Sequence, residues 1–426
     1  MPTLHWTGKE KVINHHHEVP FRILEHIYAY KNGEKTEEEN KNGNRIIHGD
    51  NLEALKSLLP EYEGKIKCIY IDPPYNTGNE NWIYNDNVND PKIKKWLHTV
   101  VGKEDLSRHD KWLCMMYPRL KLLWKFLSQN GIILISIGDD ELSNLIYMLK
   151  EIFGDLNQQG IFVWKSRLKP TNAGEAKYRP QKTTEYVLAY SKNYSAIEYE
   201  PVLVENTKYK YPHKDEKGNY RLTTILTSNR GMFQRETMRF EINGFRPDEN
   251  QRWKAGFDVI THLFSNGYLE FRKGIPFKKH YEHEENYITQ PLYTFIENEF
   301  SGTAESGKTE LNNILGLSHK FDTVKPAKLI QFFLKVFTKN DDIILDSFAG
   351  SGTAAHAVLN LNKEDGGSRR FILVEMENYA EDITAERVKR VITGYGDTEG
   401  TGGEFDFYKL GGLLFADGRF VNNKIK

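Results

Sequence analysis

Strand-like apolar runs alternate with helical segments in two separate parts of the chain. KIKCIYI (65–71) and IILISI (132–137) are apolar runs of strand length, and MYPRLKLLWKFLSQ (116–129) between them has helical spacing. The pattern returns after residue 310, where AKLIQFFLKVF (327–337) precedes the strand-like start of DDIILDSFAGSG (341–352). Strands that alternate with helices form mostly parallel sheets with helices on both faces. The sequence therefore predicts an α/β fold with a doubly wound, mostly parallel, Rossmann-like sheet.

The stretch from 165 to 310 interrupts this alternation. It is rich in Tyr, Asn, Lys and Arg, and it contains turn signals such as HKDEKGNY. Lys and Arg outnumber Asp and Glu between 160 and 260, although the whole chain has a net charge of −1. We expect an inserted α+β module with a basic surface. The predicted domain order is an N-terminal extension (1–45), the first half of the α/β domain (46–164), the inserted module (165–310), the second half (311–395) and a C-terminal segment (396–426).

Composition indicates an ordinary globular protein of a reducing compartment. The chain is 39% hydrophobic and 27% charged, and its two cysteines, Cys68 and Cys114, are too few for a disulfide framework. It has no run of about 18 apolar residues and no apolar leader segment. We therefore expect a cytoplasmic protein without a membrane contact. No metal site is expected, because the consecutive His15, His16 and His17 point in different directions and no C-x-x-C or H-E-x-x-H occurs.

Residues 302–309, GTAESGKT, match the string G-x-x-x-x-G-K-[ST] of phosphate-binding loops. Such a loop requires a buried strand before it and a helix after it, so that backbone N–H groups face the phosphates. The preceding YTFIENEFS is acidic and weakly patterned. The match is therefore predicted to be accidental, and an ATPase would need phosphate release that Lys308→Ala abolishes.

The loop DSFAGSGTAA (346–355) is a better candidate for a cofactor site, because it follows a strand-like run and opens a helical one. Gly350, Gly352 and Ala355 satisfy G-x-G-x-x-A, and Glu375 ends the next strand, where an acid can bind ribose hydroxyls. Both a nicotinamide cofactor and S-adenosylmethionine contain a ribose. Asp346 at the strand end would repel a pyrophosphate and accept from an ammonium group, which favours S-adenosylmethionine.

DPPY (72–75) lies at the carboxyl end of a predicted strand, where open α/β sheets bind ligands. Two prolines remove backbone donors and stiffen the turn, which leaves carbonyl oxygens and the Asp72 carboxylate as acceptors. An exocyclic amine supplies the two N–H donors that such a site needs. Hydrogen bonds to Asp72 and the Pro73 carbonyl would free the amine lone pair to attack a sulfonium methyl group, and Tyr75 would stack on a base turned out of its duplex.

Together these strings resemble a known family, the amino-group DNA methyltransferases. DPPYNTGNENWIYNDN, GDNLEAL upstream and DSFAGSGT downstream have the order of its β class. EYVLAYSK, FDTVKPAKLI, FILVEMENYAEDIT and FDFYKLGG resemble the modification subunits of type III restriction systems. The resemblance spans roughly 45 to 415 and is weakest from 195 to 290. It implies an S-adenosylmethionine-dependent, site-specific enzyme in which 165–310 is the target-recognition domain.

The resemblance also implies roles for individual residues. The implied catalytic residues are Asp72, Pro73, Pro74 and Tyr75. The implied cofactor-binding residues are Asp50, Lys325, Asp346, Phe348, Gly350, Gly352 and Glu375. Trp164 is implied to line the target-base pocket with Tyr75. Asp rather than Ser at the first motif position favours adenine N6 over cytosine N4.

The implied partners are double-stranded DNA, a restriction subunit with nuclease or helicase activity, and a second copy in a homodimer. Two alternatives stay open at this point. An RNA adenine methyltransferase would use the same pocket, and a DNA-recognition subunit would guide a separate nuclease or translocase. Salt-sensitive binding to duplex DNA but not to structured RNA would separate the first alternative from a DNA enzyme.

Overall fold

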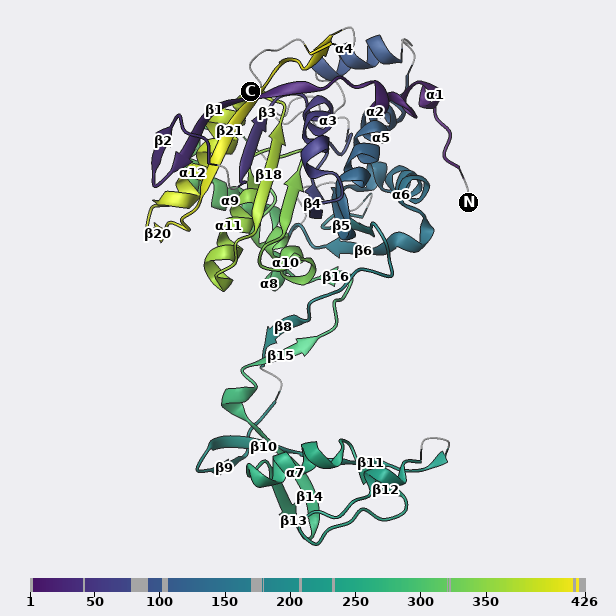
Figure 1. Ribbon diagram of the computed structural model, residues 1–426, viewed down its shortest axis with the longest axis vertical. Helices are drawn as coiled ribbons and strands as arrows, with labels where there is room; N and C mark the ends of the chain where they lie inside the picture. Colours follow the sequence, from purple (N-terminus) through teal and green to yellow (C-terminus); the bar gives the residue numbers. More distant parts are fainter. Residues whose placement is uncertain are drawn as a thin grey trace. The chain divides into compact units, whose positions relative to one another are not determined.

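The chain divides into two compact units, Met1–Glu200 with Tyr293–Lys426, and Pro201–Leu292. This computed structural model describes residues 3–40, 43–77, 91–101, 106–169, 178, 180–206, 209–231, 234–319, 321, 323–416 and 419–420. Within them, an eleven-stranded sheet forms the centre of the larger unit (Figure 1). In spatial order its strands are β16 (Phe295–Ile296), β6 (Gln158–Trp164), β7 (Glu185–Ser191), β5 (Leu127–Ile137), β4 (Ile66–Ile71), β17 (Ile343–Asp346), β18 (Arg370–Glu375), β3 (Arg45–His48), β21 (Glu404–Leu413), β1 (Arg22–Lys31) and β2 (Glu34–Thr36).

The centre of this sheet is parallel and its two sides are mixed. The six strands from β5 to β21 run parallel to one another. β7 is antiparallel to both β5 and β6, and β1 is antiparallel to β21 and β2. The predicted α/β class with a mostly parallel, doubly wound sheet is confirmed.

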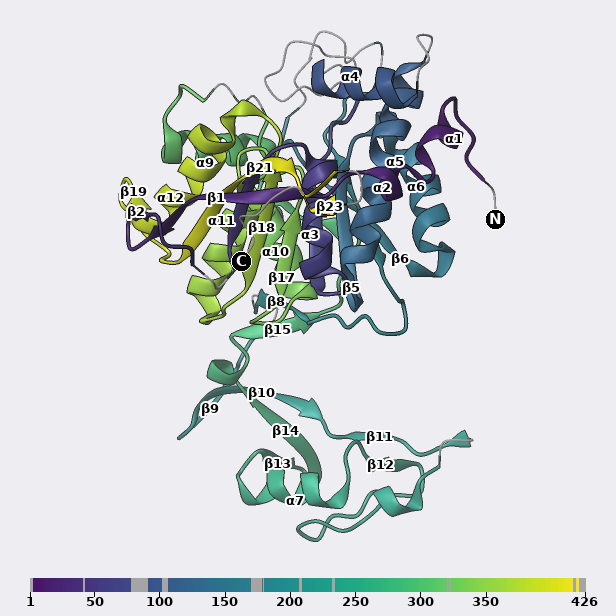
Figure 2. The same cartoon turned by 45° about the horizontal axis from the view of Figure 1, so that its top comes forward.

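Helices cover both faces of the sheet, as buried strands require. α3 (Asn51–Tyr62), α5 (Arg108–Phe126) and α6 (Asp139–Phe153) lie on one face, and α10 (Ala327–Phe337), α11 (Thr353–Asp365) and α12 (Glu386–Thr393) lie on the other (Figures 1 and 2). Alternate residues of β4 serve the two faces: Ile69 and Ile71 join the core under α3 and α5, whereas Cys68 and Tyr70 do not. Tyr70 instead points to the α10 side, where its hydroxyl shares a 2.7 Å hydrogen bond with Ser136.

Shorter elements complete the larger unit. The helices are α1 (Lys9–Val12), α2 (His15–Glu18), α4 (Pro91–Val100), α8 (Asn298–Ser301) and α9 (Ala304–Leu315), with single turns at Asp155–Asn157 and Asn378–Ala380 and a π-helical turn at Glu381–Ala385. The paired strands are β19 (Gly394–Tyr395) with β20 (Thr398–Glu399), and β22 (Phe415–Ala416) with β23 (Arg419–Phe420).

The smaller unit has its own core and an α+β composition. Its elements are β8 (Val202–Glu205) paired with β15 (Tyr287–Gln290), a sheet of β9 (His213–Asp215), β10 (Gly218–Thr224), β14 (Ile275–Tyr281) and β13 (Leu269–Arg272), the pair β11 (Leu226–Ser228) and β12 (Gln251–Trp253), the turns Glu236–Met238 and Glu282–Glu284, and α7 (Phe257–Ser265). Trp253 is fully buried at the centre of a cluster that includes Leu226 and Ile260.

The bounds of the two units differ from the domain bounds expected from the sequence. The expected inserted module, 165–310, includes β7, β16 and the first part of α9, all of which belong to the larger unit. EYVLAYS is β7, a buried strand of the central sheet. The residues before it are polar, so the sequence did not indicate that the sheet continues here. The first 45 residues are likewise not a separate extension, because β1 and β2 join the sheet through β21.

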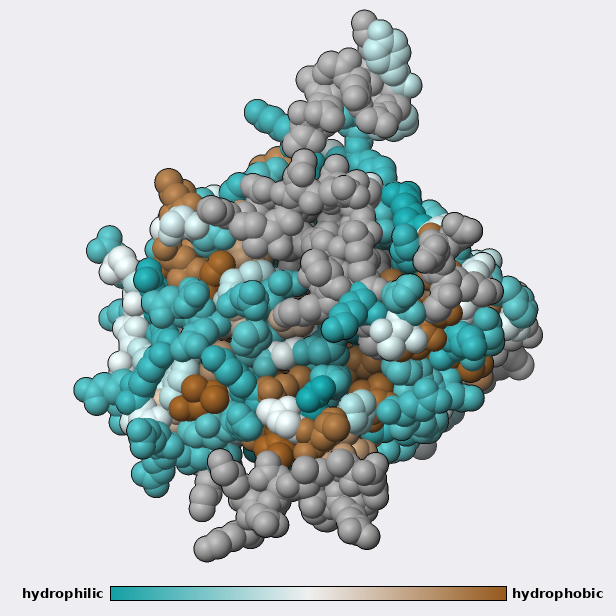
Figure 3. Space-filling view, turned by 90° about the horizontal axis from the view of Figure 1, so that it is seen from above, coloured by the Kyte–Doolittle hydropathy of each residue, from teal (hydrophilic) through white to brown (hydrophobic). Residues whose placement is uncertain are grey.

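Hydrophilic side chains predominate on the face shown in Figure 3, with hydrophobic ones in small patches between them. In the described part of the chain, no helix is both long and apolar enough to cross a membrane.

Candidate active site

Asp72 and Asp346 lie side by side because of the strand order. They come at the carboxyl ends of β4 and β17, which are parallel neighbours. From β4 the chain crosses through α5 to β5 on one side, and from β17 it crosses through α11 to β18 on the other. The sheet therefore reverses its winding between these two strands, and this is where open α/β sheets bind ligands.

A cleft at this point brings together five of the residues that the sequence predicts for the site. Its lining includes Asp72, Lys325, Asp346, Phe348 and Gly350. The other predicted cofactor residues, Gly352, Glu375 and Asp50, are not among the lining residues.

The glycine-rich turn after β17 needs its glycines for conformational reasons. Gly350 and Gly352 have φ angles of 52° and 84°, which side chains other than glycine adopt at a cost. The Gly350 N–H donates to Glu375 Oε2 at 2.7 Å, and the Glu377 N–H donates to Oε1 at 2.9 Å. Burial raises the pKa of Glu375 to about 7 against these two donors. Glu375 therefore holds the turn in place and is only partly ionised near neutral pH.

Asp346 is a buried carboxylate with little compensation for its charge. Its Oδ1 accepts from the Phe348 N–H at 2.9 Å. Burial, with the neighbouring charges of Asp72 and Glu375, raises its pKa well above the ordinary value. Among the described residues, no Lys or Arg forms an ion pair with it. A cationic ligand in the cleft would therefore be stabilised here.

The DPPY turn is held rigidly by its neighbours. Pro73 and Pro74 are buried, and Trp112 donates its indole N–H to the Pro74 carbonyl at 2.7 Å. Asn76 then turns the chain with a φ angle of 59° and donates to the Arg108 carbonyl at 3.1 Å. Among the described contacts, no donor reaches the Pro73 carbonyl, which leaves that oxygen and Asp72 as the acceptors at this strand end.

Lys325 joins the two halves of the site. Its Nζ lies 3.0 Å from each carboxylate oxygen of Asp72 and 3.3 Å from Glu185 Oε2. The Tyr75 hydroxyl donates to the same Glu185 oxygen at 3.0 Å. Burial raises the pKa of Asp72, and the Lys325 ammonium opposes that shift only in part. Burial lowers the pKa of Lys325, but Asp72 and Glu185 together raise it above the ordinary value.

Two predicted residues have evident structural roles. Trp164 is fully buried, donates its indole N–H to the Gly302 carbonyl at 3.0 Å, and lies with its ring centroid 5.7 Å from Lys325 Nζ. It exposes no ring face in this structure, and its part in a base pocket stays a prediction. Asp50 caps α3 by accepting from the N–H groups of Leu52 and Glu53. Its implied part in cofactor binding likewise stays a prediction.

Sequence reasoning missed two polar residues that complete the site. Glu185 begins β7 opposite Trp164 on β6, and this pairing places its carboxylate beside Lys325. Arg387 is fully buried on α12 and donates to Ser351, Thr353 and Glu310, which ties the glycine-rich turn to α9. Only the strand pairing and helix packing reveal these contacts, and the sequence carries no separate signal for them.

The GTAESGKT string forms the start of helix α9. This agrees with the prediction that its match to a phosphate-binding loop is accidental. Thr303 caps α9, and its capping box with Ser306 replaces any ligand at the first turn. Gly307 lies inside α9, where a Cβ atom would stand 2.3 Å from the Val324 carbonyl oxygen and 2.8 Å from the Pro326 nitrogen. This glycine therefore allows α9 to approach the segment that carries Lys325.

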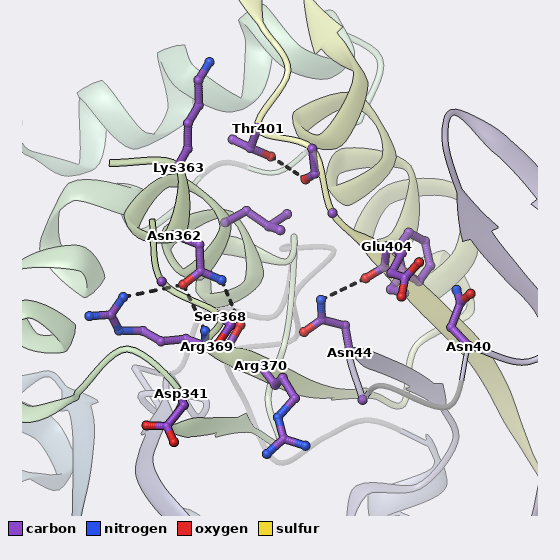
Figure 4. Close-up of a pocket in the computed structure, with 16 residues that line it drawn as sticks. Asn40, Asn44, Asp341, Asn362, Lys363, Ser368, Arg369, Arg370, Thr401 and Glu404 are labelled. Atoms are coloured by element: carbon purple, nitrogen blue, oxygen red, sulfur yellow. Dashed lines mark hydrogen bonds between the residues drawn. The ribbon is translucent and has the colours of Figure 1, made fainter. Parts of the chain in front are cut away.

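A second and wider pocket, of about 560 Å³, lies at the opposite edge of the sheet (Figure 4). Its walls come from the amino ends of parallel strands, with Asn44 before β3, Arg370 on β18 and Glu404 on β21. Asn44 donates to the Glu404 carbonyl at 2.8 Å. None of the residues predicted for the active site lines it. Within the described ranges, no group of three or more His, Cys, Asp or Glu is arranged to hold a metal ion.

Comparison with known proteins gives a consistent picture. A family described as DNA methylase, covering N6 and N4 enzymes, matches residues 66–386. The type III restriction-modification enzyme StyLTI Mod subunit of Salmonella typhimurium is 33% identical over 83% of this chain and 58% of its own length. The EcoPI Mod subunit of Escherichia phage P1 is 31% identical over 80% of this chain and 59% of its own length. The chain thus spans under two thirds of these subunits.

A shorter relative is covered more fully. The type II methyltransferase M.KpnI of Klebsiella pneumoniae is 30% identical over 78% of this chain and 80% of its own length. Among solved structures, the cytosine-N4-specific PvuII DNA methyltransferase aligns at 15% identity and a TM-score of 0.43, over 81% of this chain and 86% of that one.

Proposed function

The chain belongs to the DNA methylase family of N6 and N4 enzymes, and we propose that it transfers a methyl group from S-adenosylmethionine to the N6 amine of adenine in duplex DNA. The observation that carries this proposal is the meeting of Asp72 and Asp346 at the point where the sheet reverses its winding. One carboxylate can accept from a target amine, and the other can balance a cationic methyl donor in the same cleft.

The residues of the DPPY turn position the amine for attack. The Asp72 carboxylate and the Pro73 carbonyl accept its two N–H groups, which turns the nitrogen lone pair away from the ring. Tyr75 supplies a face for the base. S-adenosylmethionine supplies a methyl group on a positively charged sulfur. The amine nitrogen forms the new bond to the methyl carbon, the bond from that carbon to sulfur breaks, and the nitrogen then loses one proton.

The cleft suits the charge of S-adenosylmethionine. Burial, together with the like charges of Asp72 and Glu375, raises the pKa of Asp346, and a cation beside it would offset both effects. A carboxylate offers about four acceptor positions, so Glu375 can accept a ribose hydroxyl while it keeps the bonds from the Gly350 and Glu377 N–H groups. Phe348 and Gly350 form the adjacent wall. Asp50 and Lys325 belong to this proposed set on the motif resemblance alone.

Adenine N6 and cytosine N4 are both exocyclic amines, and family membership does not separate them. We favour adenine because Asp begins the DPPY motif. The similarity to type III Mod subunits supports the same choice. Asp72 lies in a cleft at a strand end, so a paired base cannot reach it, and the target must leave the duplex stack.

The inserted unit, 201–292, is the proposed DNA-reading module. Duplex readout needs an element that reaches phosphates and base edges, and this unit is an independent α+β body with an excess of Lys and Arg over Asp and Glu. We further propose that the chain acts as the modification part of a restriction-modification system, with a separate restriction subunit and as a homodimer.

The test is methyl transfer from labelled S-adenosylmethionine to unmethylated, mixed-sequence duplex DNA. The product after digestion to nucleosides should be N6-methyldeoxyadenosine, and Asp72→Ala should abolish it. Asp341→Ala is the matched control, because this exposed acid lies at the opposite edge of the sheet. N4-methyldeoxycytidine would replace the adenine assignment. Transfer to RNA alone, or cofactor binding without transfer, would favour the RNA enzyme or the guide subunit respectively.

A further inference from the structure

Lys325 places an ammonium group between two carboxylates at the site where the target amine is proposed to bind. Its Nζ lies within hydrogen-bond distance of both Asp72 oxygens and 3.3 Å from Glu185. Only 13% of its side chain is exposed. The ammonium and an exocyclic amine are alike in the feature that Asp72 recognises, a nitrogen that donates N–H groups.

The same ammonium also stands over the ring on which a base would stack. Lys325 Nζ lies 4.8 Å from the centroid of the Tyr75 ring. A base stacked on that ring, with its amine donating to Asp72, would need the space that Nζ now fills. The two nitrogens cannot occupy this position together, so the ammonium must move before the base is bound.

Glu185 offers the ammonium a second partner that is already within reach. An ammonium released from Asp72 without a partner would be a partly buried, unpaired charge, which is costly. If it shifts toward Glu185, it keeps a carboxylate partner and leaves lone pairs of Asp72 to the amine. The shift also separates the positive charge from the base, where it would draw electron density from the attacking nitrogen.

We propose that Lys325 occupies the place of the target amine in the DNA-free enzyme and passes from Asp72 to Glu185 when the base enters. Glu185 is then a positioning residue that acts through Lys325. A base with a carbonyl at this position offers Asp72 no donor and does not displace the ammonium, so the exchange also selects bases that carry an amine. This inference rests on the proposed methyl transfer.

Two pairs of variants test the exchange through kcat/KM for methyl transfer to duplex DNA, all measured at one alkaline pH of about 8.5, which favours the ionised form of Asp72. Glu185→Gln should lower kcat/KM about ten- to a hundredfold, mainly through KM for DNA, because a charge-assisted partner is lost. In the Lys325→Met background, Glu185→Gln should change kcat/KM by less than about threefold. Lys325→Arg should be slower than Lys325→Met, because a guanidinium binds Asp72 through two N–H groups and leaves it less readily.

Tyr186→Phe is the control on the same strand, since it removes a hydrogen bond to Asp139 and leaves Glu185, Tyr75 and Lys325 in place; its kcat/KM should stay close to that of the wild type. S-adenosylmethionine affinity, measured by calorimetry, should stay within about twofold in every variant that is folded. An equal loss from Glu185→Gln in both backgrounds would overturn the exchange, as would an active Lys325→Arg beside an inactive Lys325→Met. A wild-type chain that methylates no DNA would instead overturn the proposed function, and the exchange with it.

Discussion

Replacing Gly307 by alanine tests whether α9 positions Lys325. Gly307 is buried in α9, and a Cβ atom there would lie 2.3 Å from the Val324 carbonyl oxygen. The contacted atoms are backbone, so no side-chain rotation relieves the clash. The segment that leads to Lys325 must shift by about 1 Å to restore an ordinary contact distance.

The expected cost in stability is small because two effects oppose each other. Overpacking at a tight contact costs about 1–3 kcal/mol, whereas alanine in place of glycine inside a helix gains about 1 kcal/mol. The net loss in the free energy of unfolding is about 0–2 kcal/mol, which lowers Tm by no more than about 8 °C in a domain of this size. A misplacement of about 1 Å at Lys325, in contrast, is enough to lower kcat/KM about a hundredfold.

The assay pairs methyl transfer to duplex DNA with thermal unfolding. Lys308→Ala is the matched control, because it changes the adjacent residue of GTAESGKT without adding a Cβ atom at the contact. We expect Gly307→Ala to lose activity far beyond its loss of stability, and Lys308→Ala to stay within about twofold of the wild type. A fully active Gly307→Ala would refute the positioning role of this close approach. ATP hydrolysis that disappears on Lys308→Ala would revive the phosphate-loop interpretation.

Four further predictions address other parts of the molecule. Burial raises the pKa of Glu375 to about 7, so its carboxylate becomes a full acceptor only above that pH; S-adenosylmethionine affinity should rise between about pH 6 and 8, and Glu375→Gln should remove this dependence in calorimetry. Lys325→Met removes the charge that opposes the upward pKa shift of Asp72, so the acidic limb of the pH–rate profile should move to higher pH. Arg387→Met breaks a buried hydrogen-bond network and should cost about 2–4 kcal/mol in urea unfolding, against less than about 0.5 kcal/mol for the exposed Arg390→Met. Trp253→Ala removes the largest side chain from the core of the smaller unit and should lower its free energy of unfolding by about 3–5 kcal/mol. DNA binding measured by anisotropy should then fall, and S-adenosylmethionine affinity should be retained. Unchanged DNA binding would contradict the proposed role of that unit.

The sheet and the cofactor turn were predictable because their signals are local. Continuous apolar runs of strand length in KIKCIYI and DIILD, each followed by a helical pattern, specify parallel strands before any tertiary contact is known. Gly350 and Gly352 are informative for the same reason, since their positive φ angles are a requirement of the turn itself. The acids Asp72 and Asp346 end such strands, and parallel strands bring their carboxyl ends to one edge of a sheet.

The contacts of Glu185 and Gly307 were not predictable from the sequence, because long-range packing brings these residues to the site. Glu185 reaches Lys325 only through the pairing of β7 with β6, 140 positions before Lys325 in the chain. Gly307 looked like part of a phosphate loop, since a sequence string does not reveal that a glycine serves a helix contact. The domain bounds failed for a related reason, because strands at the side of a mixed sheet carry weaker apolar patterns than the central ones.

The charges around the cleft link the two binding events. Asp72, Glu185, Asp346 and Glu375 bring four carboxyl groups to one region, and Lys325 is the cation that bridges two of them. If Lys325 left Asp72 while Asp346 lacked a cation, the excess of negative charge would grow in a partly buried site and the pKa of Asp72 would rise further. A positively charged methyl donor beside Asp346 offsets that cost before the base arrives. The placement of these acids therefore favours cofactor binding first and target-base entry second, and it makes Lys325 the group on which the second step depends.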